Sequence, residues 1–186
     1  NSWDLIDPNE GWVRKNGLKR AVEMIHRFVK YHSKTDREVV GVEIDFEVVV
    51  GRAKVKGSVD RLEVSSDGSL FVIDFKTGKE AIKVEDAKTN LQLRSYQLAI
   101  AEGGFKELHP STISEGAELV YLGSDSTNAT IRKQDYIDID EMREKVTEIA
   151  EGMGSYQFAA RVNKRCSGCP VKNSCPIQSE GRAVIE

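Results

Sequence analysis

Two aspartates and a lysine in the first half of the sequence have residue types and spacing suited to hydrolytic chemistry with a divalent cation. Asp60 lies in the stretch Gly-Ser-Val-Asp-Arg, and Asp74 and Lys76 lie in the stretch Ile-Asp-Phe-Lys-Thr-Gly. Carboxylate oxygens are the ligands that Mg²⁺ and Mn²⁺ prefer. A lysine two residues beyond an aspartate shares its face of a strand, where it could help deprotonate a water molecule or offset charge at a phosphorus centre. Asp60, Asp74 and Lys76 are therefore candidate catalytic residues, the two aspartates as metal ligands.

The elements predicted around these residues can bring the two aspartates together. Apolar residues recur through residues 55–64 and fill residues 70–73, which predicts two strands, over residues 55–64 and 70–75. Ser66-Asp67-Gly68 between them is typical of a tight turn. Because adjacent strands lie about 5 Å apart, Asp60 and Asp74 can approach one cation if the register of the hairpin allows it.

An ordinary alternative for the same residues is a pair of surface ion pairs, Asp60 with Arg61 and Asp74 with Lys76. Such pairs are common on solvated sheet faces and contribute little. Asp74, however, directly follows the apolar run of residues 70–73, so its strand has a buried flank. That context favours a site over a solvated surface.

A helix predicted over Leu91–Ala101 carries two further candidates, Gln92 and Tyr96. Their spacing of four residues places both side chains on one helical face, where they could meet the strands that carry Asp60 and Asp74. The alternative is an ordinary amphipathic helix with one polar and one half-buried aromatic residue.

The rest of the sequence indicates an α/β fold of the α+β kind, with a mixed central sheet flanked by helices. Alternation predicts further strands over residues 40–48, 118–123 and 129–136, and in the first of these Glu43 and Glu47 should face solvent. Asp138 is a candidate N-cap for a helix to Met153, with Glu141 placed as in a capping box. An irregular tail follows over residues 154–186. A helix over residues 17–32 is indicated by apolar residues at helical spacing, Leu18, Val22, Ile25, Phe28 and Val29.

All three cysteines lie in the tail, as Cys166-x2-Cys169-x5-Cys175-Pro176. This spacing is typical of a metal or iron–sulfur site, and thiolates in an irregular segment can gain order from a metal. Zinc held by three cysteines and a histidine is one alternative, and three unrelated thiols is another. Clustered cysteines do not form a disulfide framework, so we expect a reducing compartment and a cytoplasmic protein.

The ordered motifs resemble those of the RecB-type branch of the PD-(D/E)XK nucleases. The resemblance covers roughly residues 40–176 and is greatest to the C-terminal nuclease domains of bacterial UvrD-like helicase–nucleases of the AdnAB and AddAB type. It implies a restriction-endonuclease-like fold. It also implies that Asp60, Asp74 and the backbone carbonyl of Phe75 are metal ligands and that Lys76 is the catalytic lysine. Gln92 and Tyr96 would be the Q-x-x-x-Y pair that borders the site.

The same resemblance implies cofactors and partners. Mg²⁺ or Mn²⁺ would serve the site, and Cys166, Cys169 and Cys175 would be three of the four ligands of a [4Fe–4S] cluster. DNA would be the substrate, and a helicase motor in the same polypeptide or complex would be the partner. The sequence has no fourth cysteine and no G-x-x-x-H pattern around His26. We therefore expect both missing ligands upstream of Asn1 and expect His26 to be structural.

Composition agrees with one globular domain over residues 1–186, and the resemblance implies that this domain is a fragment of a larger helicase–nuclease. Hydrophobic residues make up 39% and charged residues 31%, and no apolar run is long enough for a membrane span. The net charge of −3 does not exclude DNA binding, because a cation-holding site is itself acidic. No charged-then-apolar leader opens the sequence.

Two functions from different classes fit these observations. The first is a metal-dependent deoxyribonuclease of exonuclease type that processes DNA ends in repair or recombination. The second is a catalytically inactive, nuclease-like module that binds DNA or supports a helicase. The intact trio of Asp60, Asp74 and Lys76 favours the first. The sequence has no G-x-x-x-x-G-K-[ST] motif, so any unwinding must come from another domain or protein.

Overall fold

The computed structural model describes residues 3, 9, 11–155 and 160–177. It forms two compact units, Asn1–Thr147 and Glu148–Glu186. Helices and strands follow in the order α2 (Gly11–His32), β1 (Glu38–Val50), β2 (Ala53–Val64), β3 (Leu70–Lys76), α3 (Val84–Lys88), α4 (Leu91–Ala101), β4 (Ser114–Tyr121), β5 (Thr130–Asp135) and α5 (Ile139–Gly154), with 3₁₀ turns η1 (Cys166–Gly168) and η2 (Lys172–Ser174).

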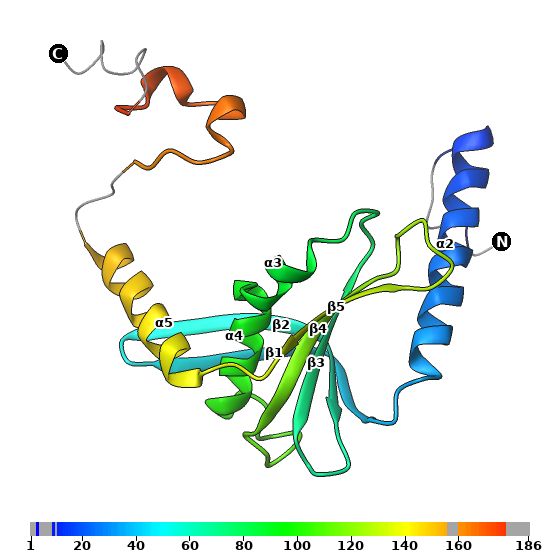
Figure 1. Cartoon of the computed structure of the whole chain (residues 1–186), viewed down its shortest axis with the longest axis horizontal. Coiled ribbons are helices and arrows are strands. Elements are labelled where there is room, and N and C mark those ends of the chain that lie inside the picture. The colour runs from blue at the N-terminus through cyan, green and yellow to red at the C-terminus, as the bar shows by residue number, and fades with distance from the viewer. Residues whose placement is uncertain (1–2, 4–8, 10, 156–159, 178–186) are drawn as a thin grey trace. The chain divides into compact units, whose positions relative to one another are not determined.

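The five strands form one mixed sheet in the order β1-β2-β3-β4-β5 (Figure 1). β1, β2 and β3 are joined as two antiparallel hairpins, as the sequence predicted, and β4 and β5 form a third antiparallel pair. β3 and β4 run parallel, because the chain crosses over through α3 and α4 between them. The mixed sheet with flanking helices confirms the predicted α+β class and agrees with a restriction-endonuclease-like fold.

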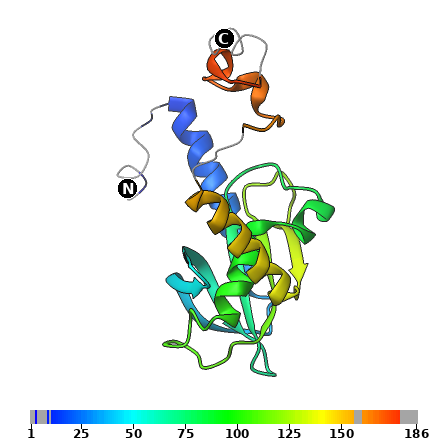
Figure 2. The ribbon, with the colours of Figure 1, turned by 90° about the vertical axis from the view of Figure 1, so that its left-hand side faces the viewer.

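α4 covers one face of the sheet and forms the main core with it (Figure 2). Leu93, Tyr96 and Ile100 of α4 pack against Leu70 and Val72 of β3, together with residues of β1, β2 and β4. α5 adds a second cluster, in which Ile139 and Met142 contact Leu98 and Val50. Period-two alternation on β3 therefore places its even-numbered residues on the α4 face.

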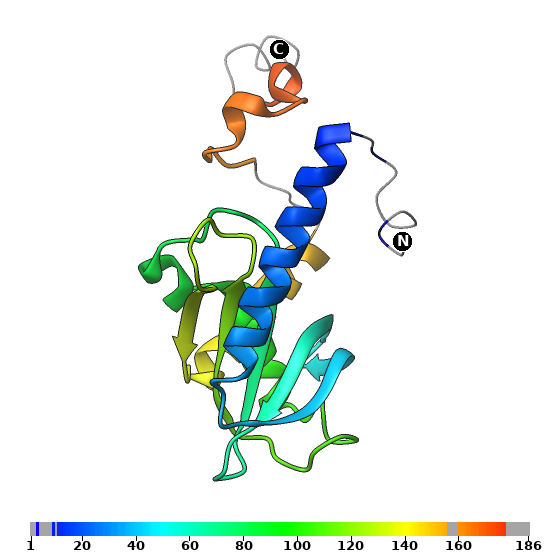
Figure 3. The same ribbon diagram turned by 90° about the vertical axis from the view of Figure 1, so that its right-hand side faces the viewer.

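α2 lies along the opposite face of the sheet (Figure 3). The small cluster there is centred on Phe71, Ile73 and Val120. Two aromatic residues of α2, Phe28 and Tyr31, meet Phe75 edge-on, at ring-centroid distances of 5.3 and 6.0 Å.

The side of α2 that faces the sheet is not the side that its apolar pattern indicated. A helix with apolar residues at helical spacing is expected to bury them. In the structure Leu18, Val22, Ile25 and Val29 are exposed, and the residue that α2 buries is Arg27. Arg27 donates to the carbonyl oxygens of Leu122 and Ser126, both at 2.8 Å. The polar contacts of Arg27 and the packing of Phe28 and Tyr31 on Phe75 hold α2 to the sheet, and of the five predicted apolar residues only Phe28 takes part.

Two other elements differ from expectation. α3 lies in a mostly charged stretch for which the sequence analysis predicted no helix. β4 begins at Ser114, four residues before the predicted start at Glu118. The sequence analysis missed these residues because Ser114, Glu115 and Gly116 show no apolar alternation, but Ser114 and Gly116 pair with β3 and Gly116 pairs with β5. Gly116 has φ 140°, and a Cβ there would lie 2.5 Å from the Gln134 carbonyl oxygen.

In β1, Val42 was expected to be buried and is exposed. The ladder with β2 pairs Val42 with Arg61 and Ile44 with Val59, and it passes over the intervening Glu43. Glu43 has a left-handed backbone, with φ 50°. This local distortion interrupts the alternation of the strand.

At the start of α5, Asp138 is the N-cap that the sequence predicted. Asp138 Oδ1 accepts from the amides of Asp140 and Glu141 at 3.0 and 3.1 Å. Glu141 does not complete a capping box, since its carboxylate instead accepts from Arg94 at 2.9 Å. Within the described residues, no helix is both long and apolar enough to cross a membrane.

Candidate active site

Gln92 joins Asp74, Lys76 and Tyr96 into one polar cluster, called the Asp74 cluster below. Gln92 Nε2 donates to Asp74 Oδ1 at 3.0 Å and lies 2.8 Å from Tyr96 Oη. Tyr96 Oη donates to Asp74 Oδ1 at 3.0 Å. Lys76 Nζ donates to Gln92 Oε1 at 3.2 Å and lies 2.6 Å from Asp74 Oδ2. Four residues that the sequence singled out separately are thus in direct contact.

The two oxygens of Asp74 have different environments. Asp74 is only 3% exposed. Oδ1 accepts the hydrogen bonds from Gln92 and Tyr96. Oδ2 accepts no hydrogen bond from any described residue, and its contact with Lys76 is an ion pair without hydrogen-bond geometry. A buried carboxylate oxygen without a donor is costly unless a cation neutralises it, so Oδ2 is the oxygen suited to a cation.

Tyr96 remains a neutral hydrogen-bond donor in this setting. Burial raises the pKa of the Tyr96 hydroxyl well above its ordinary value, and the negative charge of Asp74 raises it further. Asp60 contributes to the same rise in pKa. Both carboxylates therefore act on one hydroxyl, and Tyr96 keeps the proton that it donates to Asp74 near neutral pH.

Asp60 lies beside the Asp74 cluster at an irregular point of the sheet. The β2–β3 ladder ends at the pair Arg61–Ile73, one residue before Asp60. There Asp60 Oδ2 accepts a hydrogen bond of 2.6 Å from the backbone amide of Phe75. The β1–β2 ladder pairs Val42 with Arg61 and Ile44 with Val59, and between these pairs it includes neither Asp60 nor Glu43, whose backbone is left-handed. Strained backbone of this kind is found at functional sites more often than elsewhere.

The donors present suit a hard divalent cation. Two carboxylates, one with a buried oxygen that lacks a donor, are the kind of ligand that Mg²⁺ takes together with water and phosphate oxygens. Within the described residues there is no group of three or more histidine, cysteine or acidic side chains that could enclose a metal ion. The two carboxylates of Asp60 and Asp74 would leave the remaining positions of such a cation to phosphate oxygens and water.

Other predicted residues have contacts that do not bear on a ligand role. Phe75 contacts Asp60 through its amide, and its ring packs against Phe28, so the role of its carbonyl as a ligand stays a prediction. His26 is exposed on α2. Glu43 and Glu47 are exposed as predicted, and Glu47 pairs with Lys54 and Lys56, both at 2.6 Å.

The cysteine tail belongs to the second unit and is described by itself. Cys166, Cys169 and Cys175 are half-buried free thiols. Cys166 Sγ accepts from the amide of Asn163 at 3.2 Å. Among the described residues the three sulfurs do not form a group arranged to hold a metal ion, so their role as ligands stays a prediction.

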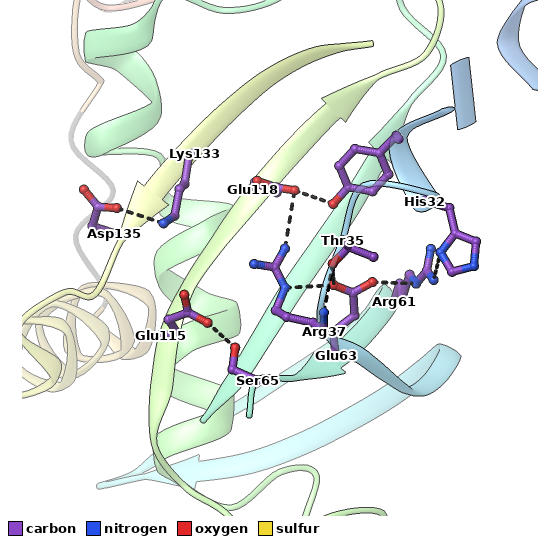
Figure 4. A network of polar contacts seen from close by, with 11 residues as sticks. His32, Thr35, Arg37, Arg61, Glu63, Ser65, Glu115, Glu118, Lys133 and Asp135 are labelled. Atoms are coloured by element: carbon purple, nitrogen blue, oxygen red, sulfur yellow. Dashed lines mark hydrogen bonds and ion pairs between the residues drawn. The ribbon is translucent and has the colours of Figure 1, made fainter. Parts of the chain in front are cut away.

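The face of the sheet beneath α2 carries a polar network that sequence reasoning missed (Figure 4). Glu63 is fully buried, and its Oε2 accepts from Arg37 Nε at 2.9 Å. Arg61 Nε lies 3.1 Å from Glu63 Oε1, and Arg61 Nη2 lies 2.8 Å from His32 Nδ1. Below, the term buried ionic network means Tyr31, Arg37, Arg61, Glu63 and Glu118.

Glu118 of β4 is the second acid of this network. Tyr31 donates a short hydrogen bond to Glu118 Oε1, and Arg37 Nη2 lies 3.9 Å from the same oxygen. The Arg37 guanidinium stacks over Phe71, 3.9 Å from the ring centroid. Burial raises the pKa of Glu118, although its hydrogen bond with Tyr31 opposes that rise. A cavity of about 690 Å³ opens onto Tyr31, Arg37 and Glu118.

One signal for this network was present in the sequence. Arg61 and Glu63 alternate with the apolar Leu62, and Glu118 stands between Ala117 and Leu119 in an apolar strand. Period-two alternation places such residues on the face opposite the core. Their burial depends on α2 covering that face, which alternation alone does not show.

Comparison with known protein families matches residues 1–176 to the PD-(D/E)XK nuclease superfamily. Among solved structures, one described as "Crystal structure of SSO0001" is similar over 88% of this chain and 71% of that chain, with 19% sequence identity and a TM-score of 0.40. A search among curated proteins found no match.

Proposed function

The chain belongs to the PD-(D/E)XK nuclease superfamily, and we propose that it is a divalent-metal-dependent DNA nuclease of the RecB-like branch. One observation carries this proposal: Asp74, Lys76, Gln92 and Tyr96 form one hydrogen-bonded cluster, and Asp60 lies beside it. A relic fold without catalytic function would have no need to keep two carboxylates, a lysine and their orienting donors in mutual contact.

Asp60 and Asp74 are the residues that would hold the metal, through Asp74 Oδ2 and an oxygen of Asp60. When bound, Mg²⁺ or Mn²⁺ would lower the pKa of a coordinated water molecule and neutralise charge on the scissile phosphate. Gln92 and Tyr96 orient Asp74, because both donate to Oδ1 and so fix which oxygen is free for a cation.

Lys76 has two roles in this proposal. Before a cation binds, its ammonium group neutralises the buried charge of Asp74 across 2.6 Å. A cation held by Asp74 would take over that task and leave the ammonium group of Lys76 available to the substrate. Held by Gln92 Oε1 at 3.2 Å, it can then orient the attacking water or stabilise the negative charge that grows on the phosphate.

The finer parts of the proposal rest on the resemblance of the motifs. We propose exonuclease-type processing of DNA ends in repair or recombination, in the cytoplasm. A helicase motor in the same polypeptide or complex would be the partner. Residues 1–186 would form one nuclease domain, with residues 154–186 as its tail. In that tail Cys166, Cys169 and Cys175 would hold a [4Fe–4S] cluster, or zinc, with a fourth ligand from outside this chain.

A second candidate function is a catalytically inactive DNA-binding or structural module of a helicase. The observation that favours it is the ion pair between Lys76 and Asp74, in which the ammonium group already neutralises the carboxylate that would bind a metal. The two candidates differ in whether a divalent cation can displace that ammonium group.

A cleavage assay separates the two candidates. The chain is incubated with linear and circular DNA, single- and double-stranded, over a titration of Mg²⁺ and Mn²⁺. We expect metal-dependent cleavage that Asp74→Ala and Lys76→Ala each reduce roughly a hundredfold or more. Asp45→Ala, which removes an exposed acid from β1, is the matched control and should cleave normally. Full cleavage by Asp74→Ala would remove the basis of the assignment.

A further inference from the structure

The exposed side of α2 carries a continuous apolar stripe. Leu18, Val22, Ile25 and Val29 are 38%, 41%, 58% and 57% exposed. Their spacing of four, three and four residues places them in one row along the helix, roughly 17 Å long at about 1.5 Å per residue. Scattered apolar residues on a surface need no explanation, but a row of four with helical spacing does.

Contacts with the sheet hold α2 in the orientation that exposes this stripe. The side of α2 directly opposite the stripe is fixed to the sheet by Arg27, which bonds two carbonyl oxygens, and by Tyr31, which bonds Glu118. Arg20 Nη2 adds a bond of 2.6 Å to the Thr77 carbonyl oxygen. Because these contacts fix the rotation of the helix about its axis, the stripe cannot turn inward without breaking them.

The spacing of the stripe is that of a coiled-coil seam. Positions that alternate by four and three residues are the a and d positions of a heptad, and Val and Ile are well suited to them. The apolar surface is narrow, as in a seam between two helices. A helix that binds a lipid surface has a broader apolar face that includes large aromatic residues. Trp12 of α2 is 74% exposed, but its helical position places it on the flank with Lys15 and Lys19 and not in the row, so the stripe fits a partner helix better than a membrane.

The charge of α2 indicates which kind of helix would bind. Between Gly11 and His32 there are six basic side chains and one acidic side chain, Glu23. Lys15, Lys19 and Lys30 lie along one flank of the stripe, and Lys19 makes only a long ion pair of 4.0 Å with Glu23. Two copies of α2 would bring like charges together, which opposes self-association.

We propose that α2 is a docking surface for an acidic amphipathic helix of a partner protein. The apolar residues of that helix would pack into the row formed by Leu18, Val22, Ile25 and Val29, and its acidic residues would lie against the flanking lysines. The second unit of this chain is a poorer occupant, since residues 148–186 contain five basic and four acidic side chains. This surface is separate from the Asp74 cluster, because α2 lies on the opposite face of the sheet.

The test uses the full chain and two synthetic helical peptides of about three heptads with identical Leu residues at a and d. One peptide carries Glu at the flanking positions and the other carries Lys. We expect the acidic peptide to bind about tenfold or more tightly than the basic one by fluorescence anisotropy. Ile25→Glu and Val22→Glu should abolish binding. Val49→Glu, at an equally exposed residue of β1, is the control and should not. Lys19→Glu with Lys30→Glu should reverse the peptide preference.

Several results would overturn the proposal. Equal affinity for the two peptides would exclude charge selection, and equal loss of binding in Val49→Glu would place the contact elsewhere. Concentration-dependent self-association that Ile25→Glu abolishes would make a second copy the occupant. Tighter binding to vesicles of anionic phospholipid than to the acidic peptide would make α2 a membrane contact. Slow amide exchange along α2 with no peptide binding would show that the chain covers the stripe itself. Circular dichroism melts of each variant show that the fold is intact.

Discussion

The two faces of the sheet place polar groups in different ways. On the α4 face an apolar core surrounds one small cluster, in which Asp74 is held by Gln92 and Tyr96 from the helix. On the α2 face the apolar cluster is small, and fully buried Glu63 and its arginines connect the helix region to the strands. The same strands supply both faces, because their side chains alternate.

The two faces differ in whether the charges of their buried carboxylates are neutralised by fixed arginines or by a group that a metal ion could replace. In the buried ionic network an arginine lies beside each oxygen of Glu63, so two guanidinium groups match its charge, although Glu63 Oε1, like Asp74 Oδ2, accepts no hydrogen bond from a described residue. In the Asp74 cluster one carboxylate oxygen has only a lysine ammonium group beside it, which a stronger cation can replace. We therefore expect substitutions on the α2 face to act mainly on stability and substitutions in the Asp74 cluster to act mainly on chemistry.

The largest effect on stability should come from Glu63→Gln. The substitution keeps the shape of the side chain but leaves the buried Arg61 without its negative partner and leaves Arg37 with only the 3.9 Å contact to Glu118. Breaking a buried ion pair by removing one partner costs about 3–5 kcal/mol. Urea unfolding measures the loss, and Glu47→Gln, which removes an exposed acid paired with two lysines, should change little. Similar midpoints for the two variants would contradict the contrast between the faces.

Asp74→Asn should show the opposite balance. Its amide oxygen can still accept from Tyr96 and Gln92, so the free energy of unfolding should fall less than in Glu63→Gln. The loss of negative charge should weaken Mn²⁺ binding and slow cleavage by about a hundredfold or more. Parallel calorimetry, cleavage assays and melts measure the three effects. A loss of stability as great as that of Glu63→Gln would make Asp74 a structural residue.

Lys76→Met should have a smaller effect, which is to strengthen metal binding although cleavage is lost. Methionine keeps the length of the side chain and removes the ammonium group that lies 2.6 Å from Asp74 Oδ2. With that competitor gone, Mn²⁺ should bind about tenfold more tightly, which corresponds to about 1.4 kcal/mol, while cleavage is lost. Calorimetric titration of the intact chain measures the affinity. Unchanged or weaker binding would mean that Lys76 does not occupy the place of the cation.

The α4 face could be predicted from the sequence, and the α2 face could not. Alternation through β3 and helical spacing in α4 are local patterns, so they placed Asp74, Lys76, Gln92 and Tyr96 on facing surfaces. The hydrogen bonds among these residues connect positions no more than 22 residues apart. Because the motifs already lie close in sequence, local patterns carried most of the information about this cluster.

The α2 face depends on contacts between distant parts of the chain. Tyr31 and Glu118 are 87 residues apart, and Arg27 contacts carbonyl groups 95 and 99 residues away. No local pattern records such pairings. The apolar row of α2 even indicated the wrong buried side, since hydrophobic periodicity identifies an apolar face but not what covers it. The left-handed backbone at Glu43 likewise had no signal in the sequence.

The smallest predicted effect is a pH dependence that belongs to Glu118. Burial raises the pKa of this carboxyl above its ordinary value of 4.5, against the opposing influence of Tyr31, Arg37 and Lys133, while Glu63 adds to the rise. An acid whose pKa is higher in the folded state binds more protons there than in the unfolded state. Its contribution to stability is therefore fully present below pH 4.5 and is lost as pH rises through the folded pKa.

Glu118→Gln removes the titration and keeps an acceptor for Tyr31, so the free energy of unfolding of the variant should fall less over that range than that of the wild type. Urea unfolding at intervals from pH 4 upward measures the difference between the two curves, and Glu115→Gln serves as the control at a nearby acid of β4 for which burial is less complete. Parallel curves for the wild type and Glu118→Gln would show that burial does not raise the pKa of Glu118.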